Sequence, residues 1–213
     1  MAPAQTAKAD TRTRIIDAAR ELFHANGFQA TTMAEILAKS GVNSGSLYYF
    51  FKSKDELLLA VLDSYVDLMW PLVMEPAFGA TDDPIERIFT VLDGYRQLLA
   101  ANSCAIGCPI GNLALELVDA RPEIREKISL NFSNWCEAIR RCLGEAADRL
   151  PPDLDQARLS RFVLTVMEGG IMQARGHRRI EPYEEAVAQL RDYFNLLLES
   201  RAGDRARRSG SRN

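Results

Sequence analysis

Residues 31–54, TTMAEILAKSGVNSGSLYYFFKSK, predict two short helices joined by a tight turn and followed by the start of a long third helix. Thr32 and Glu35 stand three residues apart, the spacing of a capping box, in which each side chain accepts a hydrogen bond from the other residue's backbone. Gly41 suits the left-handed residue that ends the first helix. The stretch therefore predicts a helix-turn-helix, whose second helix can lie in the major groove of DNA.

The second helix of this motif starts with small polar residues and continues with aromatic residues. Asn43 or Ser44 can cap it, and small side chains let its N-terminus, which favours anions, approach phosphates and base edges closely. A helical hairpin without a ligand is the alternative, because such hairpins are common. The predicted DNA contacts are Thr32, Asn43, Ser44, Gly45, Ser46, Tyr48, Tyr49 and Lys54.

These residues and their neighbours resemble the DNA-binding domain of the tetracycline-repressor (TetR) family of bacterial regulators. The resemblance implies a DNA-binding transcriptional regulator, usually a repressor, that acts as a homodimer. One position departs from the family, because Phe50 stands where a polar side chain often contacts a phosphate. The matching residues are Arg14–Ala19, Leu22, Phe23, Gly27, Phe28, Thr31, Thr32, Ile36, Ser40–Val42, Gly45–Phe51 and Lys54.

The charge of the chain is unevenly distributed, although the net charge is only −3. Residues 1–54 contain seven Lys and Arg against four Asp and Glu, whereas residues 55–200 contain fourteen against twenty-four. Residues 201–213 contain five Arg and one Asp. A basic N-terminal part on an acidic body is typical of a protein that binds DNA through one end, although chance can produce an asymmetry of this size.

Composition and motifs limit the other function classes. The 213 residues are 47% hydrophobic, which is enough for a sizeable core, and no apolar run is long enough for a membrane span. The N-terminus lacks the apolar region of a signal peptide, so we expect a cytoplasmic protein with no membrane partner. The chain contains no phosphate-binding glycine motif and no nucleophile elbow, and its two histidines are far apart. We therefore expect no enzyme activity, no cofactor and no metal.

The hydrophobic periodicity predicts helices throughout the chain. The fold class expected is all α, with residues 1–53 as a three-helix DNA-binding head and residues 54–200 as a larger helical domain for ligand binding and dimerisation. Residues 201–213 are expected to be a disordered basic tail. The longer predicted helices span residues 11–26, 53–70, 83–102, 122–150, 155–179 and 181–198, with Pro71 ending or kinking the second and a loop at 75–81.

Residues 107–112, Gly-Cys-Pro-Ile-Gly-Asn, resemble a Gly-Cys-x-x-Gly-Asn signature in a subgroup of the same family. Some members of that subgroup sense reactive electrophiles through the cysteine, which corresponds to Cys108. A thiol at a helix N-terminus is more nucleophilic at neutral pH, and Pro109 suits the first helical turn. The alternative is a small buried hydrophobic residue, the usual role of a free cysteine.

The body is expected to bind a small apolar or electrophilic effector that lowers the affinity for a palindromic, double-stranded DNA operator. The effector achieves this by preferring a body conformation in which the two heads of the dimer are wrongly spaced. The predicted ligand or sensor residues are Cys108, Asn112, Met69, Phe89, Tyr95, Trp135 and Met167. For each aromatic residue among them, an ordinary place in the core is the alternative.

The last two predicted helices carry continuous apolar stripes. Two such helices from each chain can form a four-helix interface, which predicts a homodimer. Packing within one chain is the alternative explanation of the same stripes. The predicted interface residues are Phe162, Val166, Gly170, Leu190, Phe194 and Leu197.

Overall fold

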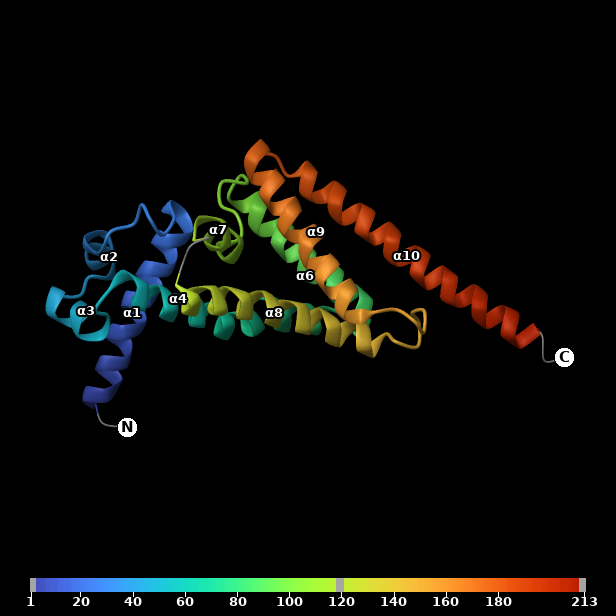
Figure 1. The fold of residues 1–213 in the computed structure, drawn as a ribbon, viewed down its shortest axis with the longest axis horizontal. Coiled ribbons are helices and arrows are strands. Elements are labelled where there is room, and N and C mark those ends of the chain that lie inside the picture. The colour runs from blue at the N-terminus through green and yellow to red at the C-terminus, as the bar shows by residue number, and fades with distance from the viewer. Residues whose placement is uncertain (1–2, 118–120, 211–213) are drawn as a thin grey trace. The chain divides into compact units, whose positions relative to one another are not determined.

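The computed structural model describes residues 3–117 and 121–210, and the side chains of residues 10–117 and 121–203. The described residues form helices joined by turns and contain no strand (Figure 1). This confirms the predicted all-α fold class. The elements are α1 Pro3–Asn26, α2 Met33–Ser40, α3 Ser44–Phe50, α4 Lys54–Met69, the π-helical segment η1 Trp70–Met74, α5 Glu75–Ala80, α6 Pro84–Ala101, α7 Pro109–Glu116, α8 Pro122–Glu145, α9 Gln156–His177 and α10 Glu181–Gly210.

The chain divides into two compact units, which differ from the predicted division at residue 53. The first, called the head unit here, comprises residues 1–68 and 106–132. Its core joins apolar side chains of α1–α4 to those of α7 and the start of α8, so these later segments belong with the helix-turn-helix. The buried core residues include Ile15, Ala19, Phe23, Ile36, Leu47, Leu57, Leu58, Leu62, Ile110, Leu113, Ile124 and Ile128.

The second unit, called the body unit here, comprises residues 69–105 and 133–213. Within it α9 and α10 lie side by side and both pack on α6 (Figure 1). Gly170 permits the close approach of α9 to α10, because a Cβ atom at this position would lie 3.0 Å from the ring of Tyr183. The hydroxyl of the buried Tyr183 donates a hydrogen bond of 2.8 Å to the carbonyl of Leu92 on α6.

The helix after Lys54 continues further than the sequence predicted. Pro71 lies in the π-helical segment η1, and the residues expected to form a loop at 75–81 form α5 up to Ala80. Proline has no backbone N–H, and a π-helical turn accommodates the missing bond without ending the helix. Residues 54–80 are long and apolar enough to cross a membrane by length and composition alone, and 33% of their most apolar window is buried inside the chain.

The expected disordered tail also differs from the structure. Helix α10 continues through Gly210, so residues 201–210 are helical, and residues 211–213 lie outside the described residues. This segment is rich in arginine and alanine, which are strong helix formers, and it extends a helix that has already been nucleated.

Candidate nucleic-acid interface

The caps of α2 and α3 have the geometry that the sequence predicted. Thr32 Oγ1 accepts a hydrogen bond of 3.2 Å from Glu35 N, and Glu35 Oε2 accepts one of 2.7 Å from Thr32 N. These bonds hold the pKa of Glu35 below its usual value, through the backbone N–H of Thr32 first and its hydroxyl second. Gly41 is left-handed with φ 65°, and Asn43 Oδ1 accepts a bond of 2.8 Å from Ser46 N. The two helices are therefore fixed locally at their starts.

Helix α3 has one buried side and one exposed side. The side chain of Leu47 is completely buried in the core of the head unit, and Phe51 at the end of the helix is 3% exposed. By contrast, Tyr48 and Tyr49 are 49% and 62% exposed, which is unusual for large aromatic side chains. The predicted contacts Asn43, Ser44 and Gly45 are also exposed. The exposed side of α3 thus presents polar and aromatic groups to a partner.

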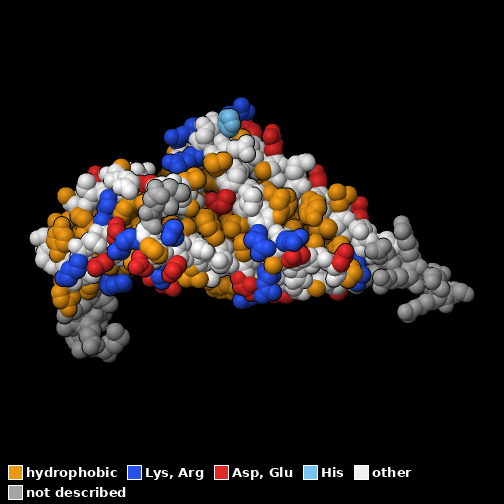
Figure 2. All heavy atoms as spheres, in the orientation of Figure 1, with side chains coloured by type: hydrophobic (Ala, Val, Ile, Leu, Met, Phe, Trp, Pro, Cys, Tyr) orange, Lys and Arg blue, Asp and Glu red, His pale blue; other side chains and the backbone are white. Residues whose placement is uncertain are grey.

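Basic side chains lie in and beside the helix-turn-helix, and the face that Figure 2 shows carries basic, acidic and apolar side chains together. Arg14 donates to the carbonyl of Ser40 at 2.7 Å, and Lys39 pairs with Glu21 at 2.7 Å. Lys52 is exposed and donates one hydrogen bond of 2.7 Å to the carbonyl of Tyr48. Sequence reasoning did not single out Lys52, although its position four residues after Tyr48 on the recognition segment was a usable signal.

Lys54 was predicted to contact DNA, and its geometry points to another role. Its Nζ donates to the carbonyls of Phe28 at 2.9 Å, Gln29 at 3.4 Å and Thr31 at 2.9 Å, and it lies 4.4 Å from the centre of the Phe28 ring. An ammonium group has three N–H donors, and these carbonyls use all of them. Lys54 therefore fastens the turn between α1 and α2, and a phosphate would have to displace these bonds.

The predicted ligand and sensor residues fall into both units. Cys108 and Asn112 belong to the head unit, where Cys108 caps α7 and its Sγ accepts a bond of 3.4 Å from Gly111 N. This confirms the predicted place of Cys108 at a helix N-terminus. The other five belong to the body unit, where Phe89, Trp135 and Met167 are buried and Met69 and Tyr95 are partly exposed. The structure thus does not gather all seven within one unit.

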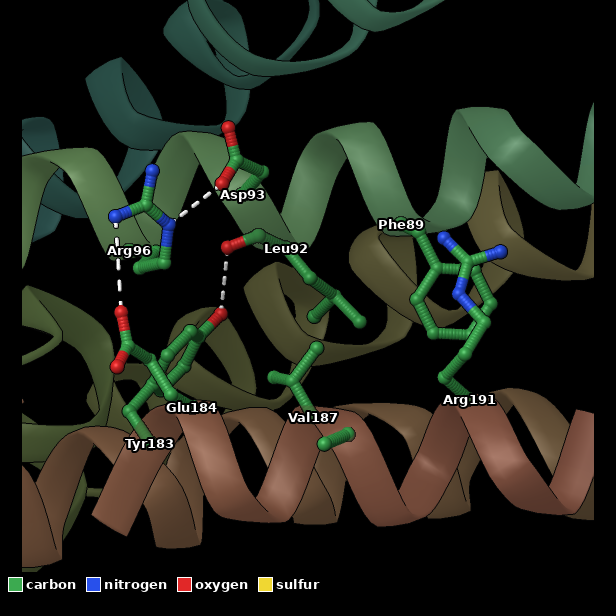
Figure 3. A pocket seen from close by; sticks show the side chains of 9 residues that line it. Phe89, Leu92, Asp93, Arg96, Tyr183, Glu184, Val187 and Arg191 are labelled. Atoms are coloured by element: carbon green, nitrogen blue, oxygen red, sulfur yellow. Dashed lines mark hydrogen bonds and ion pairs between the residues drawn. The ribbon is translucent and has the colours of Figure 1, made fainter. Parts of the chain in front are cut away.

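A groove of about 340 Å³ lies between α6 and α10 of the body unit (Figure 3). Phe89 is the only predicted ligand residue among those that line it. Arg96 pairs with Asp93 at 2.6 Å and approaches Glu184 at 3.7 Å, while the guanidinium of Arg191 lies 3.4 Å from the centre of the Phe89 ring. The lining residues are Phe89, Leu92, Asp93, Arg96, Tyr183, Glu184, Val187, Ala188 and Arg191. They come from segments about 90 residues apart, so sequence periodicity could not group them.

The predicted dimer interface is partly corrected. Leu190 and Phe194 are 2% and 0% exposed, because they pack inside their own chain, where the Phe194 ring meets that of Phe89 at 5.4 Å. Gly170 is buried against Tyr183 and is likewise an intrachain contact. Phe162 and Tyr193 instead face outward and form an edge-to-face pair with ring centres 5.9 Å apart. Other exposed apolar side chains on these two helices are Met172 and Leu196, while Val166 and Leu197 are partly exposed.

Comparison with known proteins relates both parts of the chain to one family. Residues 15–61 match the pattern of bacterial regulatory proteins of the tetR family, and residues 84–190 match that of tetracyclin repressor-like C-terminal domains. A helix-turn-helix regulator of Mycobacterium tuberculosis without an assigned role is 28% identical over 193 residues, which cover 88% of this chain and 94% of that protein.

Two further proteins show the same relationship. The transcriptional repressor DhaR of Mycobacterium sp. strain GP1 is 23% identical over 91% of this chain and 96% of its own length. The crystal structure of a TetR regulator from Chloroflexus aurantiacus superposes with a TM-score of 0.74 at 28% identity, covering 89% of this chain and 96% of that one. The relatives are transcriptional regulators rather than enzymes. The chain therefore belongs to the tetR family of bacterial regulatory proteins and is a DNA-binding, helix-turn-helix transcriptional regulator.

Proposed function

We propose that this protein is a homodimeric, cytoplasmic repressor that binds a palindromic DNA operator and leaves it when a small molecule binds the body unit. The exposed side of α3 carries the proposal, because large aromatic side chains and unburied polar groups stand together on a helix whose other side is buried. The name of the similar protein DhaR, a repressor, supports the sign of regulation.

The proposed DNA contacts lie at the start and along the exposed side of α3. At Gly45 a Cβ atom would lie 3.3 Å from Asn43 Oδ1, so the absence of a side chain leaves room for the cap and for close approach of the DNA backbone. Lys52 replaces Lys54 as the proposed phosphate contact, because the side chain of Lys52 is exposed, whereas the Nζ of Lys54 donates to three carbonyls. The full proposed set is Thr32, Asn43, Ser44, Gly45, Ser46, Tyr48, Tyr49 and Lys52.

DNA binding is tested by fluorescence anisotropy with duplexes that tile the region upstream of the protein's own gene. We expect one duplex to bind more tightly than a scrambled duplex of equal length, and Tyr49→Ala to weaken that binding. Arg158→Gln serves as the control, because this exposed arginine lies at the start of α9 in the body unit. The proposal fails if neither the upstream duplexes nor a wider genomic library yields a preferred site.

The dimer is proposed to form through the outward apolar faces of α9 and α10. Phe162 and Tyr193 are 46% and 41% exposed, which leaves their ring edges for a second copy to cover. A twofold dimer would place two α3 helices about 34 Å apart, the spacing of successive turns of one DNA groove. Tyr193→Glu should shift sedimentation from dimer to monomer, whereas Leu98→Glu, at a more exposed apolar position on α6, should not. Dimers that persist in Tyr193→Glu would place the interface elsewhere.

The effector is proposed to bind among the buried residues of the body unit. The indole Nε1 of Trp135 is buried, and no hydrogen-bond acceptor contacts it in the part of the chain that the structure describes. A buried donor without an acceptor costs roughly 1–3 kcal/mol, and an oxygen of an effector would recover that free energy. Small apolar molecules with a carbonyl or hydroxyl group are therefore the class to screen. The predicted residues Phe89, Tyr95 and Met167 stay in the proposed effector site.

Trp135→Phe keeps most of the apolar volume and removes the donor. We expect this variant to bind the operator duplex as the wild type does and to need a higher effector concentration for release. Equal release curves for Trp135→Phe and wild type would remove the indole from the effector site.

A second candidate function is a thiol-based sensor that switches through Cys108, and its place at the start of α7 favours it. Burial raises the pKa of Cys104 and Cys136, and that of Cys142 to about 11, so these three thiols are weak nucleophiles at neutral pH. Treatment with N-ethylmaleimide should release the duplex from the wild type but not from Cys108→Ser. Release from both proteins, or from neither, would argue against Cys108 as the sensor.

A further inference from the structure

The turn between α1 and α2, residues 27–31, is held from two sides by charged side chains of the head unit. The carboxylate of Glu116, the last residue of α7, accepts hydrogen bonds from Phe28 N at 2.9 Å and from Gln29 N at 2.6 Å. The ammonium of Lys54, the first residue of α4, donates hydrogen bonds to the carbonyls of the same two residues and of Thr31. The backbone N–H and the carbonyl of both Phe28 and Gln29 are thus bound by charged side chains far away in the sequence.

The backbone of the turn is shaped for this carboxylate. Gly27 has φ +89°, and a Cβ atom at this position would lie 3.2 Å from an oxygen of Glu116. Thr31, which is completely buried, donates its hydroxyl to the carbonyl of Gly27 at 2.7 Å and so closes the turn on itself. A side chain at Gly27 would crowd the carboxylate and strain the backbone, so the glycine and the glutamate form one arrangement.

The other end of the α7 segment is fastened to the same part of the head. The ring of His24, in the last turn of α1, forms a hydrogen bond of 2.7 Å with the carbonyl of Gly107, the residue before Cys108. Because α7 is attached at both ends to α1 and to the turn after it, a movement of α7 must pull on residues 24–29 or break these bonds. The turn leads directly into Thr32, the cap of α2, and α2 leads through Gly41 to α3, which packs on α1 as α2 does.

We infer that Glu116 is a positioning residue for DNA binding: its carboxylate holds the α1–α2 turn so that α2 and α3 keep their DNA-binding arrangement. The inference rests on the proposed function, because it names the contact through which a change at α7 reaches the recognition helix. A carboxylate that accepts two backbone N–H groups makes strong, directional bonds, so the link has two discrete states, made or broken. A switch needs such a two-state element.

The first test compares Glu116→Ala, Glu116→Gln and the wild type by anisotropy with the preferred duplex, and measures amide hydrogen exchange at Phe28 and Gln29. Glu116→Ala should weaken binding by about five- to 150-fold, the usual range of coupling between sites, and should speed exchange at both amides. Glu116→Gln keeps one acceptor oxygen, so its DNA affinity and amide exchange rates should lie between those of Glu116→Ala and the wild type. Glu126→Gln, an exposed carboxylate on α8, is the matched control.

The outcomes separate the inference from the proposed function. If the wild type and the Glu126→Gln control bind no duplex preferentially, the proposed function fails. If both bind and Glu116→Ala binds equally well despite faster exchange at the two amides, the inference is wrong.

A measurement on the unaltered protein covers the case in which Glu116→Ala does not fold. Duplex binding to the wild type should slow exchange at Phe28 and Gln29, together with that at the start of α3, because DNA stabilises the arrangement in which the link is made. Slower exchange at α3 with unchanged exchange at Phe28 and Gln29 would overturn the inference.

Discussion

Two regions of the head unit differ in how their polar groups are bound: the exposed side of α3, which is proposed to contact DNA, and the turn between α1 and α2. On α3, Asn43 uses one oxygen to cap the helix, while Ser44, Gly45 and Tyr48 remain exposed. At the turn between α1 and α2, charged side chains from α4 and α7 bind successive backbone groups. The difference teaches that the proposed DNA surface keeps polar groups exposed, whereas the backbone groups of Phe28 and Gln29 in the turn are bound by side chains of their own chain.

The two regions also differ in how they are stabilised. Helix α3 has only seven residues, and a helix of that length is unstable in isolation. Its stability therefore comes from burying Leu47 and Phe51 rather than from its own backbone bonds. The turn, by contrast, is fixed by hydrogen bonds between segments that are 23 to 88 residues apart.

The largest expected effect separates the two sides of α3. Leu47→Ala should lower the free energy of unfolding by roughly 2–5 kcal/mol, because the leucine is completely buried and its removal leaves a cavity. Tyr48→Ala, on the exposed side, should change it by less than about 0.5 kcal/mol while weakening DNA binding. Urea unfolding and anisotropy measure the two quantities. Similar stability losses in both variants would show that α3 is not divided in this way.

The next effect distinguishes Lys54, which binds the α1–α2 turn, from Lys52, which follows α3. Lys54→Met should cost roughly 1–3 kcal/mol of stability, because three carbonyls lose their donor, and should leave the salt dependence of DNA binding unchanged. Lys52→Met should barely affect stability and should reduce the slope of log K against log salt by about 0.9. A reduced slope in Lys54→Met would restore Lys54 as a phosphate contact.

A smaller effect separates capping from DNA contact at a single position. Asn43→Ala should cost about 1 kcal/mol, because Ser46 N loses its acceptor. Asn43→Asp keeps the cap, and a carboxylate suits a helix N-terminus, so stability should be retained while repulsion of the phosphates weakens DNA binding. For Asn43→Asp, thermal unfolding should therefore match that of the wild type, whereas anisotropy should show weaker DNA binding. Unchanged DNA affinity in Asn43→Asp would place the phosphates away from the start of α3.

The smallest effect is a pH dependence at the start of α2. The hydrogen bonds from Thr32 depress the pKa of Glu35 in the folded state, so its contribution is present above the unfolded value of about 4.3 and is lost as the pH falls through the folded pKa. Glu35→Gln should therefore flatten the decline of thermal stability below about pH 4 and change little at pH 7. An identical acid profile in wild type and variant would show that the capping box adds no pH-dependent stability.

Local features were predictable from the sequence because they involve neighbours in the chain. The box of Thr32 and Glu35, the left-handed Gly41 and the cap at Asn43 each depend on residues at most a few positions apart. The place of Cys108 at the start of α7 followed in the same way from the proline after it. In each case the local backbone geometry favours a few residue types at that position.

Contacts with distant segments of the chain were not predictable from the sequence in this way. Periodicity showed that Leu190 and Phe194 lie on an apolar stripe, but a stripe does not say whether α6 of the same chain or a second chain covers it. Lysine in a DNA-binding motif suggested a phosphate contact for Lys54, and three carbonyls of the α1–α2 turn occupy it instead. Periodicity likewise does not reveal that α7 returns to the head core, because this contact joins distant segments of the chain.

The sequence by itself determined the all-α fold, the helix-turn-helix and its caps, since these follow from short-range spacing and backbone preference. Only the tertiary structure decided what each apolar stripe packs against, which lysine is left exposed, and that Glu116 meets the turn at Phe28 and Gln29. Those outcomes depend on segments brought together across the chain, where burial and long-range hydrogen bonding, rather than local preference, set the free energy.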